Sequence, residues 1–385
     1  MRRALEIAAV AGVLTVAALA TGSPVFLAPA VLLALAEALA LVTTAWAARS
    51  LRIEAHSEQR ALRRGDALTL TVTVSHRCLL PIAPLLLTVE GLPGTEPFDV
   101  RLDETRRGRS TFALTLDAPH VGVSHPGISA ATVSDLFGLR EKSVPVGLPE
   151  EDTVVLPATF RVEPLRFAPV EATAGAMARA TEDITDPADT RAWQPGDALK
   201  KVHWKLTARK RELMVRRFEE PVPHEALLML DCAAAGGQAA SIRDALCETA
   251  ASVIENELRA EHRLCVPLND QQPGDIAALA AMPFALERLA RCAMTGRERL
   301  DSVIRREANR VRQTGAVVVV TARLTERAVE ALLQLRRLGP TLRLYLIAAE
   351  DNPRWYPMIR RLQLGGAEVT VIPAEGETAQ EAFES

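Results

Sequence analysis

Two long apolar runs near the start of the chain limit its fold more than any other feature. The first run covers residues 4–21 and the second covers residues 25–48, and each contains a single glutamate as its only charged residue. Each run approaches the roughly 20 residues that a helix needs to cross the hydrocarbon core of a bilayer. Because a Gly-Ser-Pro breaker at 22–24 separates them, the sequence predicts a transmembrane helical hairpin over residues 1–50.

Positive charges on both sides of this hairpin predict its orientation. Arg2 and Arg3 precede the first run, and further arginines follow the second: Arg49, Arg52, Arg60, Arg63 and Arg64. Since positive flanks stay in the cytoplasm, we expect a two-pass protein of the cytoplasmic (inner) membrane with the bulk of the chain in the cytoplasm. The first run also has the layout of a signal peptide cleaved after Ala20. In that case the second run still anchors the chain on the same side.

Glu37 is the polar exception near the middle of the second run. An ionisable group at such a depth costs about 2.5 to 3.5 kcal/mol on insertion scales for similar groups. Two roles stay open for Glu37. It contacts a partner helix or handles protons, or it is a protonated or hydrogen-bonded glutamate inside the hairpin.

Between about residues 51 and 160, apolar and polar residues alternate with a period of two. Leucines and valines at 68, 70, 72 and 74 alternate with threonines, and the alternation recurs over 112–116. Turn-forming Gly and Pro residues separate these stretches. Short alternating strands at this spacing predict an all-β, immunoglobulin-like sandwich of about seven strands.

From about residue 223 to residue 385, short apolar strands alternate with amphipathic helices. Strands are expected at 227–230, 264–268, 317–320, 342–347 and 368–372, and helices at about 238–260, 300–312, 326–338 and 354–364. Alternation of this kind predicts a doubly wound α/β domain with a parallel sheet. Ligands of such domains bind at the carboxyl ends of the strands.

Residues 161–222 are expected to form a linker, and they contain a concentrated basic segment. Between residues 200 and 217 eight residues are basic and one is acidic, a local charge of +7 in a chain of net charge −3. The rest of the chain therefore carries −10. These cations pair with acidic loops of the same protein, contact a protein partner, or bind anionic lipid or nucleic acid.

A motif of turn, aromatic and basic residues lies in this segment: Arg191, Trp193, Pro195, Gly196, Asp197, Lys200, Lys201, His203, Trp204, Lys205 and Arg209. It resembles the signature of the bacterial "domain of unknown function 58" family, approximately R-x-Y-x-P-G-D-x-x-R-x-I-H-W-K-x-x-A-R. Residues 135–139 are similar to the D-P-F-G-L of that family, with leucine in place of proline. We expect a turn at Pro195-Gly196, a helix from Ala198 capped by Asp197, and an ordered structural role for His203.

The resemblance extends over essentially the whole chain and implies a C-terminal domain similar to a von Willebrand factor A domain. Such domains hold Mg²⁺ through a D-x-S-x-S motif after their first strand. In this sequence Asp231 remains, but alanines stand at 233 and 235, and Thr321 and Ala322 follow a later strand. Since Mg²⁺ needs oxygen ligands, we predict no metal site and no cofactor, with Asp231 as the remnant of a degenerate motif.

No sequence feature supports catalysis, because the chain has no phosphate-binding glycine loop, no HExxH and no nucleophile elbow. Five cysteines, without metal-ligand spacing, also exclude a disulfide framework. We therefore expect a membrane-anchored interaction or scaffold protein rather than an enzyme. The resemblance implies a MoxR-type AAA ATPase and a transglutaminase-like membrane protein as partners, in protein-complex or cell-envelope assembly. The alternative is a membrane-proximal module that binds an anionic ligand, lipid before nucleic acid, through residues 200–217.

Overall fold

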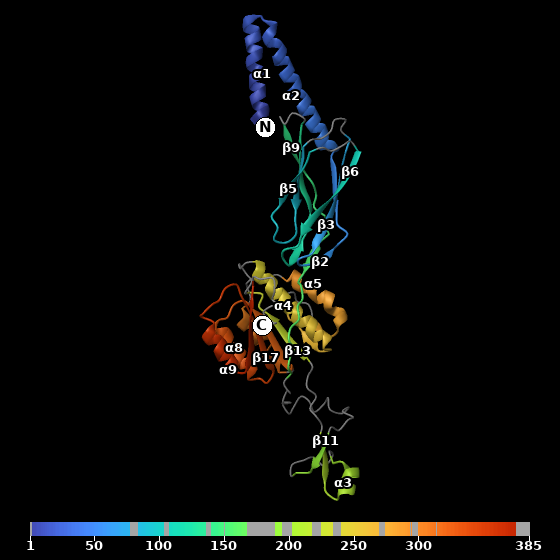
Figure 1. Ribbon diagram of the computed structural model, residues 1–385, viewed down its shortest axis with the longest axis vertical. Coiled ribbons are helices and arrows are strands. Elements are labelled where there is room, and N and C mark those ends of the chain that lie inside the picture. The colour runs from blue at the N-terminus through green and yellow to red at the C-terminus, as the bar shows by residue number, and fades with distance from the viewer. Residues whose placement is uncertain are drawn as a thin grey trace. The chain divides into compact units, whose positions relative to one another are not determined.

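The computed structural model describes residues 2–77, 84–103, 108–135, 140–149, 151–167, 189–194, 202–217, 225–233, 240–268, 274–292, 294, 299–312 and 314–374. Figure 1 shows a mixed α/β protein with apolar helices at its amino terminus and several β-sheets. The chain divides into two compact units. The first contains residues 1–158 and 286–291, and the second contains residues 159–285 and 292–385. The predicted multidomain class is confirmed at this level.

Two apolar helices, α1 (Arg2–Thr21) and α2 (Pro24–Ser50), begin the first unit. The hydroxyl of Ser23 accepts a hydrogen bond from the Val25 N–H (3.4 Å), and Pro24 stands in the first turn, where a missing N–H costs nothing. Among the described residues, α2 is the one helix long and apolar enough to cross a membrane, because the described apolar part of α1 is shorter. One candidate membrane helix of the predicted hairpin is therefore supported.

The part of the first unit from residue 51 to residue 158, named the β region here, consists of three small sheets. Their strand orders are β1-β3-β6, β5-β4-β8-β9 and β2-β10-β7. The strands are β1 (Arg52–His56), β2 (Ala61–Arg63), β3 (Ala67–His76), β4 (Leu85–Glu90), β5 (Phe98–Leu102), β6 (Gly108–Asp117), β7 (Gly122–Ser124), β8 (Gly127–Ser134), β9 (Glu141–Pro145) and β10 (Thr153–Leu156). All these pairs are antiparallel except the parallel pair of β2 and β10.

The core of the β region follows from the alternation in its strands. Leu68, Leu70, Val72 and Val74 of β3 are buried and share one hydrophobic cluster with side chains of β4, β6 and β8. The residues between them in β3 are exposed or partly exposed. Successive side chains of a strand point to opposite faces, so the predicted period of two is confirmed in this part of the chain.

The helix α2 continues into the β region with a single residue between them. The N–H of Leu51 donates to the carbonyl of Ala47 (2.9 Å), and β1 begins one residue later. Ala40, Thr44 and Ala47 are the buried residues of the carboxyl-terminal half of α2, and their spacing places them on one helix face. Ala47 belongs to the core cluster of the β region. This half of α2 therefore packs against the β region.

A six-stranded sheet of order β15-β14-β13-β16-β17-β18 forms the centre of the second unit, named the α/β region here. Its strands are β13 (Glu225–Leu230), β14 (Arg263–Cys265), β15 (Asp275–Ile276), β16 (Ala316–Thr321), β17 (Thr341–Ala348) and β18 (Ala367–Pro373). All neighbours are parallel except β14 and β15. Every residue of β16 is buried, as expected for a central strand of a parallel sheet covered on both faces.

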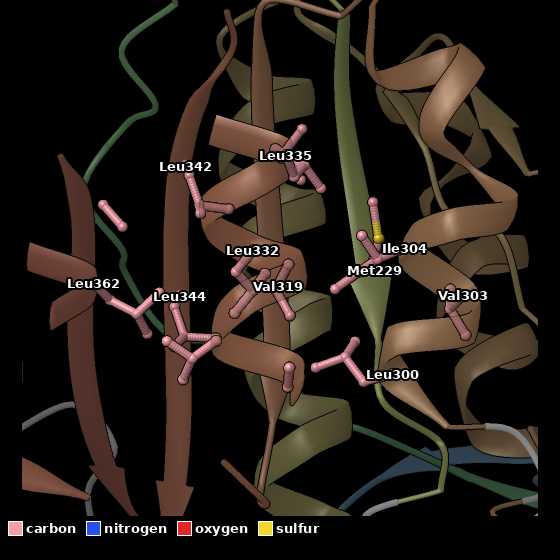
Figure 2. Close-up of a cluster of buried hydrophobic side chains, with 14 of the residues drawn as sticks. Met229, Leu300, Val303, Ile304, Val319, Leu332, Leu335, Leu342, Leu344 and Leu362 are labelled. Atoms are coloured by element: carbon pink, nitrogen blue, oxygen red, sulfur yellow. The ribbon is translucent and has the colours of Figure 1, made fainter. Parts of the chain in front are cut away.

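Helices cover both faces of this sheet. They are α4 (Ala240–Arg259), α6 (Leu300–Arg306), α7 (Ala308–Val311), α8 (Glu326–Arg336) and α9 (Tyr356–Leu364). A short 3₁₀ turn at Leu279–Ala281 precedes α5 (Met282–Arg291), whose residues 286–291 belong to the first unit. Figure 2 shows leucines of α8 and α9 and apolar side chains of α6 gathered over the sheet around Val319 and Leu344. Alternate residues of the same strands face α4 on the other side.

Residues 159–167, named the strap here, lie on the α/β region. Ser252 and Glu257 of α4 accept hydrogen bonds from strap N–H groups at 2.9 and 3.0 Å. Arg343 of β17 donates to a strap carbonyl at 2.7 Å. Because side chains of two elements satisfy the strap backbone, this part of the predicted linker is fixed on the domain that follows it.

Candidate functional site

The family motif builds a small unit of two strands and one helix. The strands β11 (Asp189–Ala192) and β12 (Met214–Arg217) are antiparallel, and α3 (Trp204–Lys210) precedes β12. We name the described residues 189–194 and 202–217 the signature unit. Val202 bridges to Val215, and both are buried together with Met214. These side chains provide the small apolar core on which α3 is held.

His203 ends the extended segment and begins the helix. Its N–H donates to the carbonyl of Met214 (2.7 Å), and its Nδ1 accepts a hydrogen bond from the N–H of Leu206 (3.2 Å). His203 is therefore the N-cap of α3, a structural role of the kind expected for it. The helix expected from Ala198 does not run through Val202, because Val202 is bridged to Val215 and α3 begins at Trp204, and Ala198 itself lies outside the described residues.

One aromatic ring and four cations are exposed around α3 and at the residue that follows it, and we name this set the cationic face: Trp204, Lys205, Arg209, Lys210 and Arg211. All five residues are exposed, Trp204 by 62%. Within the part of the chain that the structure describes, none of the four cations makes an ion pair. Like charges this close repel one another in the absence of a counter-charge. An anionic partner would relieve that repulsion.

Arg211 completes the cationic face from an unusual backbone position. It follows α3 with a φ of 56°, in the left-handed region that closes many helices. Lys210 and Arg211 were counted in the basic segment, but the motif comparison did not single them out. The sequence feature that indicated them was the net positive charge of residues 200–217, to which every cation of that segment contributes.

The structure places only part of the predicted motif. Arg191 lies in β11, and the N–H of Trp193 donates to the carbonyl of Leu213 (2.7 Å), so both stand on the strand side of the unit. Pro195, Gly196, Asp197, Lys200 and Lys201 lie outside the described residues, and so do residues 136–139 of the second family motif. His203, Trp204, Lys205 and Arg209 are brought together at α3.

A second candidate site lies at the carboxyl ends of β13 and β16. These strands are neighbours, and the chain leaves them toward opposite sides of the sheet, which makes this edge a topological switch point. A cavity of about 240 Å³ opens there and is lined by Asp231, Arg299, Leu300, Asp301, Arg323, Thr325 and Ala328. Asp231 is buried, and its carboxylate accepts a hydrogen bond from the hydroxyl of Thr321 (2.7 Å).

The groups around Asp231 do not fit a divalent cation. Two guanidinium groups line the same cavity, and Asp301 is paired with Arg299 (3.2 Å) and with Arg305. Among the described residues no group of three or more His, Cys, Asp or Glu side chains is placed to hold a metal. Ala234 and Ala235 of the degenerate motif lie outside the described residues. The carboxylates of Asp231 and Asp301 are instead bonded to threonine and arginine side chains of the same protein.

Cys232, next to Asp231, is a buried thiol with a raised pKa. Its Sγ lies 3.4 Å from the Sγ of Cys292, and this contact and burial together raise the pKa of Cys232 well above its usual range. Burial raises the pKa of Cys247 and of Cys265 to about 12 each. Since the thiolate is the reactive form, none of these three groups is prepared for nucleophilic attack.

We expect the four described thiols of the folded protein to resist alkylation. At pH 8, iodoacetamide should modify Cys232, Cys247, Cys265 and Cys292 at least about tenfold more slowly than in denaturant, because each is buried and the pKa values of three are raised. Peptide mass spectrometry of timed samples measures each site separately. Rapid labelling of Cys232 in the folded protein would contradict the inert role.

Comparison with known proteins identifies the family of this part of the chain. A family model described as "Protein of unknown function DUF58" matches residues 189–339. This range begins at β11, contains the whole signature unit and ends after α8. Residues 189–339 are a DUF58 region. The predicted family is thereby confirmed, and the cationic face and the cavity at Asp231 both lie in the DUF58 region. No curated protein matches the chain.

Two solved structures resemble this chain only at very low sequence identity and TM-score. Cwp6 from Clostridium difficile shares 10% sequence identity at a TM-score of 0.19, and the match covers 86% of this chain and 38% of that one. A GH20 exo-β-N-acetylglucosaminidase from Vibrio harveyi, solved with N-acetylglucosamine, shares 9% identity at a TM-score of 0.21, covering 84% and 82%. Scores this low carry no argument about fold or function.

Proposed function

We propose that this protein is a non-enzymatic, membrane-attached interaction protein that binds an acidic protein partner through its cationic face. The observation that carries the proposal is the exposure of Trp204 among four cations without ion-pair partners in the described part of the chain. The family resemblance suggests the partner, a MoxR-type AAA ATPase. It also suggests a transglutaminase-like membrane protein in the same assembly, at work on protein complexes or the cell envelope.

Three observations favour a protein partner over internal pairing or a lipid surface. Internal pairing would place a carboxylate within ion-pair distance of these cations, and among the described residues no such ion pair is formed, although Glu212 follows Arg211 in the sequence. Trp204 is the residue type most enriched at energetic centres of protein interfaces. Finally, the cap at His203 and the bridge at Val202 present the cations on a fixed backbone, which suits a partner of defined shape.

Two finer fold assignments, an immunoglobulin-like sandwich and a von Willebrand factor A-like domain, are consistent with this proposal by analogy. Two antiparallel sheets with a common core are consistent with an immunoglobulin-like sandwich in the β region. A parallel sheet with Asp231 after its strand β13 is consistent with a von Willebrand factor A-like domain that has lost its metal. Both kinds of domain commonly serve as interaction modules, and neither analogy assigns a substrate.

The N-terminal helices would attach this interaction protein to the inner membrane from the cytoplasmic side. Arginines follow α2 immediately, which favours a cytoplasmic β region under the positive-inside rule. The two-pass topology predicted from the sequence is one way to achieve this attachment. The proposed interaction requires only that the signature unit reaches the cytoplasm.

Reversing charge on the cationic face should abolish capture of the partner. We expect the double variant Lys205→Glu and Arg209→Glu to lose at least about tenfold in affinity for the ATPase, or about 1.4 kcal/mol, because two attractive contacts become repulsive. Trp204→Ala should weaken binding by a similar or larger factor. Crosslinked affinity purification of the tagged full-length chain from native membranes, followed by mass spectrometry, measures the captured partner.

A matched control reverses exposed charges elsewhere, with Arg109→Glu and Lys142→Glu in the β region. This control should retain the partner. Retention by the Lys205 and Arg209 variant would overturn the proposal, and loss of binding to phosphatidylglycerol vesicles instead would support the lipid alternative. Circular dichroism distinguishes loss of binding from loss of folding, because the variant is expected to keep its secondary structure.

A further inference from the structure

An ion pair joins the second apolar helix to the β region at a position that the sequence placed inside the membrane. The Nη2 of Arg140 donates to Oε1 of Glu37 at 2.8 Å. Arg140 stands at the end of the β8–β9 pair, where its N–H donates to the Asp135 carboxylate (2.7 Å) and its carbonyl accepts from the Asp135 N–H (3.1 Å). Glu37 therefore lies beside a polar end of a sheet.

This contact fixes how deep the bilayer can reach along α2. From Glu37 toward the carboxyl end, Ala40, Thr44 and Ala47 of α2 pack on the β region. Sheet ends, and the polar backbone that connects their strands, do not enter lipid hydrocarbon, because water is absent there and each unsatisfied group costs several kcal/mol. The hydrocarbon boundary consequently lies at or above the level of Glu37.

The apolar part of the hairpin beyond that boundary is shorter than a bilayer. At 1.5 Å per residue, α2 rises about 20 Å from Glu37 to Pro24. The helix α1, which is antiparallel to α2 (Figure 1), rises about 22 Å from its own glutamate, Glu6, to Thr21. A hydrocarbon core is about 30 Å thick, so the turn at residues 22–23 falls about 10 Å short of the far side.

Two N–H groups at the turn between α1 and α2 have hydrogen-bond partners within the chain. The Ser23 hydroxyl accepts from the Val25 N–H and the Ser23 carbonyl accepts from the Phe26 N–H, each at 3.4 Å, while Pro24 has no N–H to satisfy. The hydroxyl of Thr21 donates a hydrogen bond to the carbonyl of Ala17 (2.7 Å). The N–H groups of Val25 and Phe26 thus have partners within the chain, which lowers the cost of placing these two donors in lipid.

In the carboxyl-terminal half of α2, the face that points away from the β region provides a second lipid contact. Leu39, Val42 and Trp46 are 49%, 57% and 42% exposed, and their spacing places them on the face away from Ala40, Thr44 and Ala47. Tryptophan is enriched at the headgroup level of membranes. These apolar side chains therefore lie on the side of α2 that the β region leaves uncovered, where they can contact lipid.

We propose that the α1–α2 hairpin enters the bilayer from one side and ends among the acyl chains, as a monotopic wedge. Its partner is the hydrocarbon of the lipid, the Glu37–Arg140 pair marks the headgroup level, and Leu39, Val42 and Trp46 rest in the interface. This inference rests on the membrane attachment in the proposed function and replaces the two-pass topology. It does not depend on the identity of the partner of the cationic face.

Cysteine accessibility in the full-length chain tests the depth of the turn. Ser23→Cys is introduced with Cys78→Ser, so that the remaining native thiols are the four buried ones. A membrane-impermeant sulfonated maleimide is applied to right-side-out vesicles, to inverted vesicles and after detergent. We expect labelling at position 23 only after detergent. The control Glu58→Cys, exposed in the β region, should be labelled in inverted vesicles but not in right-side-out ones.

Each other outcome overturns the inference in a recognisable way. Labelling of Ser23→Cys in right-side-out vesicles would show that the hairpin crosses the bilayer, and membrane attachment and partner binding would both survive. Labelling in inverted vesicles without detergent would place the turn in water on the cytoplasmic side. Release of the chain by carbonate washing would remove membrane attachment itself, and with it the membrane part of the proposed function.

Discussion

Truncating Leu332 to alanine should destabilise the α/β region by about 2 to 5 kcal/mol, the usual cost of a fully buried leucine. Leu332 of α8 is completely buried and packs in the cluster of Val319, Leu342 and Leu344 on the sheet (Figure 2). The truncation leaves a cavity between a helix and a sheet that both remain anchored at their ends. Hydrogen exchange of β16 and β17, read by mass spectrometry, measures the local free energy of opening.

Leu364→Ala is the matched control, since it makes the same chemical change at a leucine that is 82% exposed in α9. We expect that change to stay within about 0.5 kcal/mol. Equal effects of the two variants would mean that the cluster around Leu332 does not carry the stability of the sheet. Local exchange is the suitable measurement because a chain of two units does not unfold in a single two-state step.

Replacing Arg343 with methionine should release the strap. Arg343 is 6% exposed, and its guanidinium contacts Glu368 at 2.5 Å and a strap carbonyl at 2.7 Å. Methionine retains most of the volume but leaves the strap carbonyl without its donor, at an expected cost of about 1 to 3 kcal/mol. The Glu368 carboxylate is half exposed and can be hydrated instead. We expect exchange of residues 159–167 to accelerate most, because they lose a bond to the sheet.

The comparison for this prediction is Arg361→Met. Arg361 pairs with Glu326 at 3.3 Å, but both side chains are more than half exposed, and such surface pairs contribute about 0 to 1 kcal/mol. If the strap exchanges at its original rate in Arg343→Met, then Ser252 and Glu257 suffice to hold it, and the role assigned to Arg343 is wrong.

The regular elements of this protein could be predicted well from the sequence because their periodicity is local. Every strand expected between residues 227 and 372 is present within a few residues, and so are the helices now seen as α4, α8 and α9. The helix α5 was missed, because its proline at position 283 looks like a breaker although proline fits the first turn. The helix expected at 300–312 is divided into α6 and α7 at Glu307.

The candidate sites could be predicted only where they are continuous in sequence. Trp204, Lys205 and Arg209 of the cationic face were singled out because they lie close together in the sequence, whereas Lys210 and Arg211 were included only in the count of local charge. The cavity at Asp231 was not, since Arg299 and Arg323 come from loops that follow different elements and meet only through the order of the strands. The contact of Glu37 with Arg140 spans 103 residues, and no local pattern indicates which charge of the β region would meet the helix.

The short passage from α2 into β1 has a mechanical consequence. With Leu51 alone between α2 and β1, and Ala47 in the core of the β region, α2 and the sheets would tilt together. A change of 10° in helix tilt would displace the far end of the ten-residue strand β3 by about 6 Å, at a rise of about 3.3 Å per residue. Any change in the tilt of α2 in a membrane would therefore change the height and angle of the β region relative to the bilayer surface.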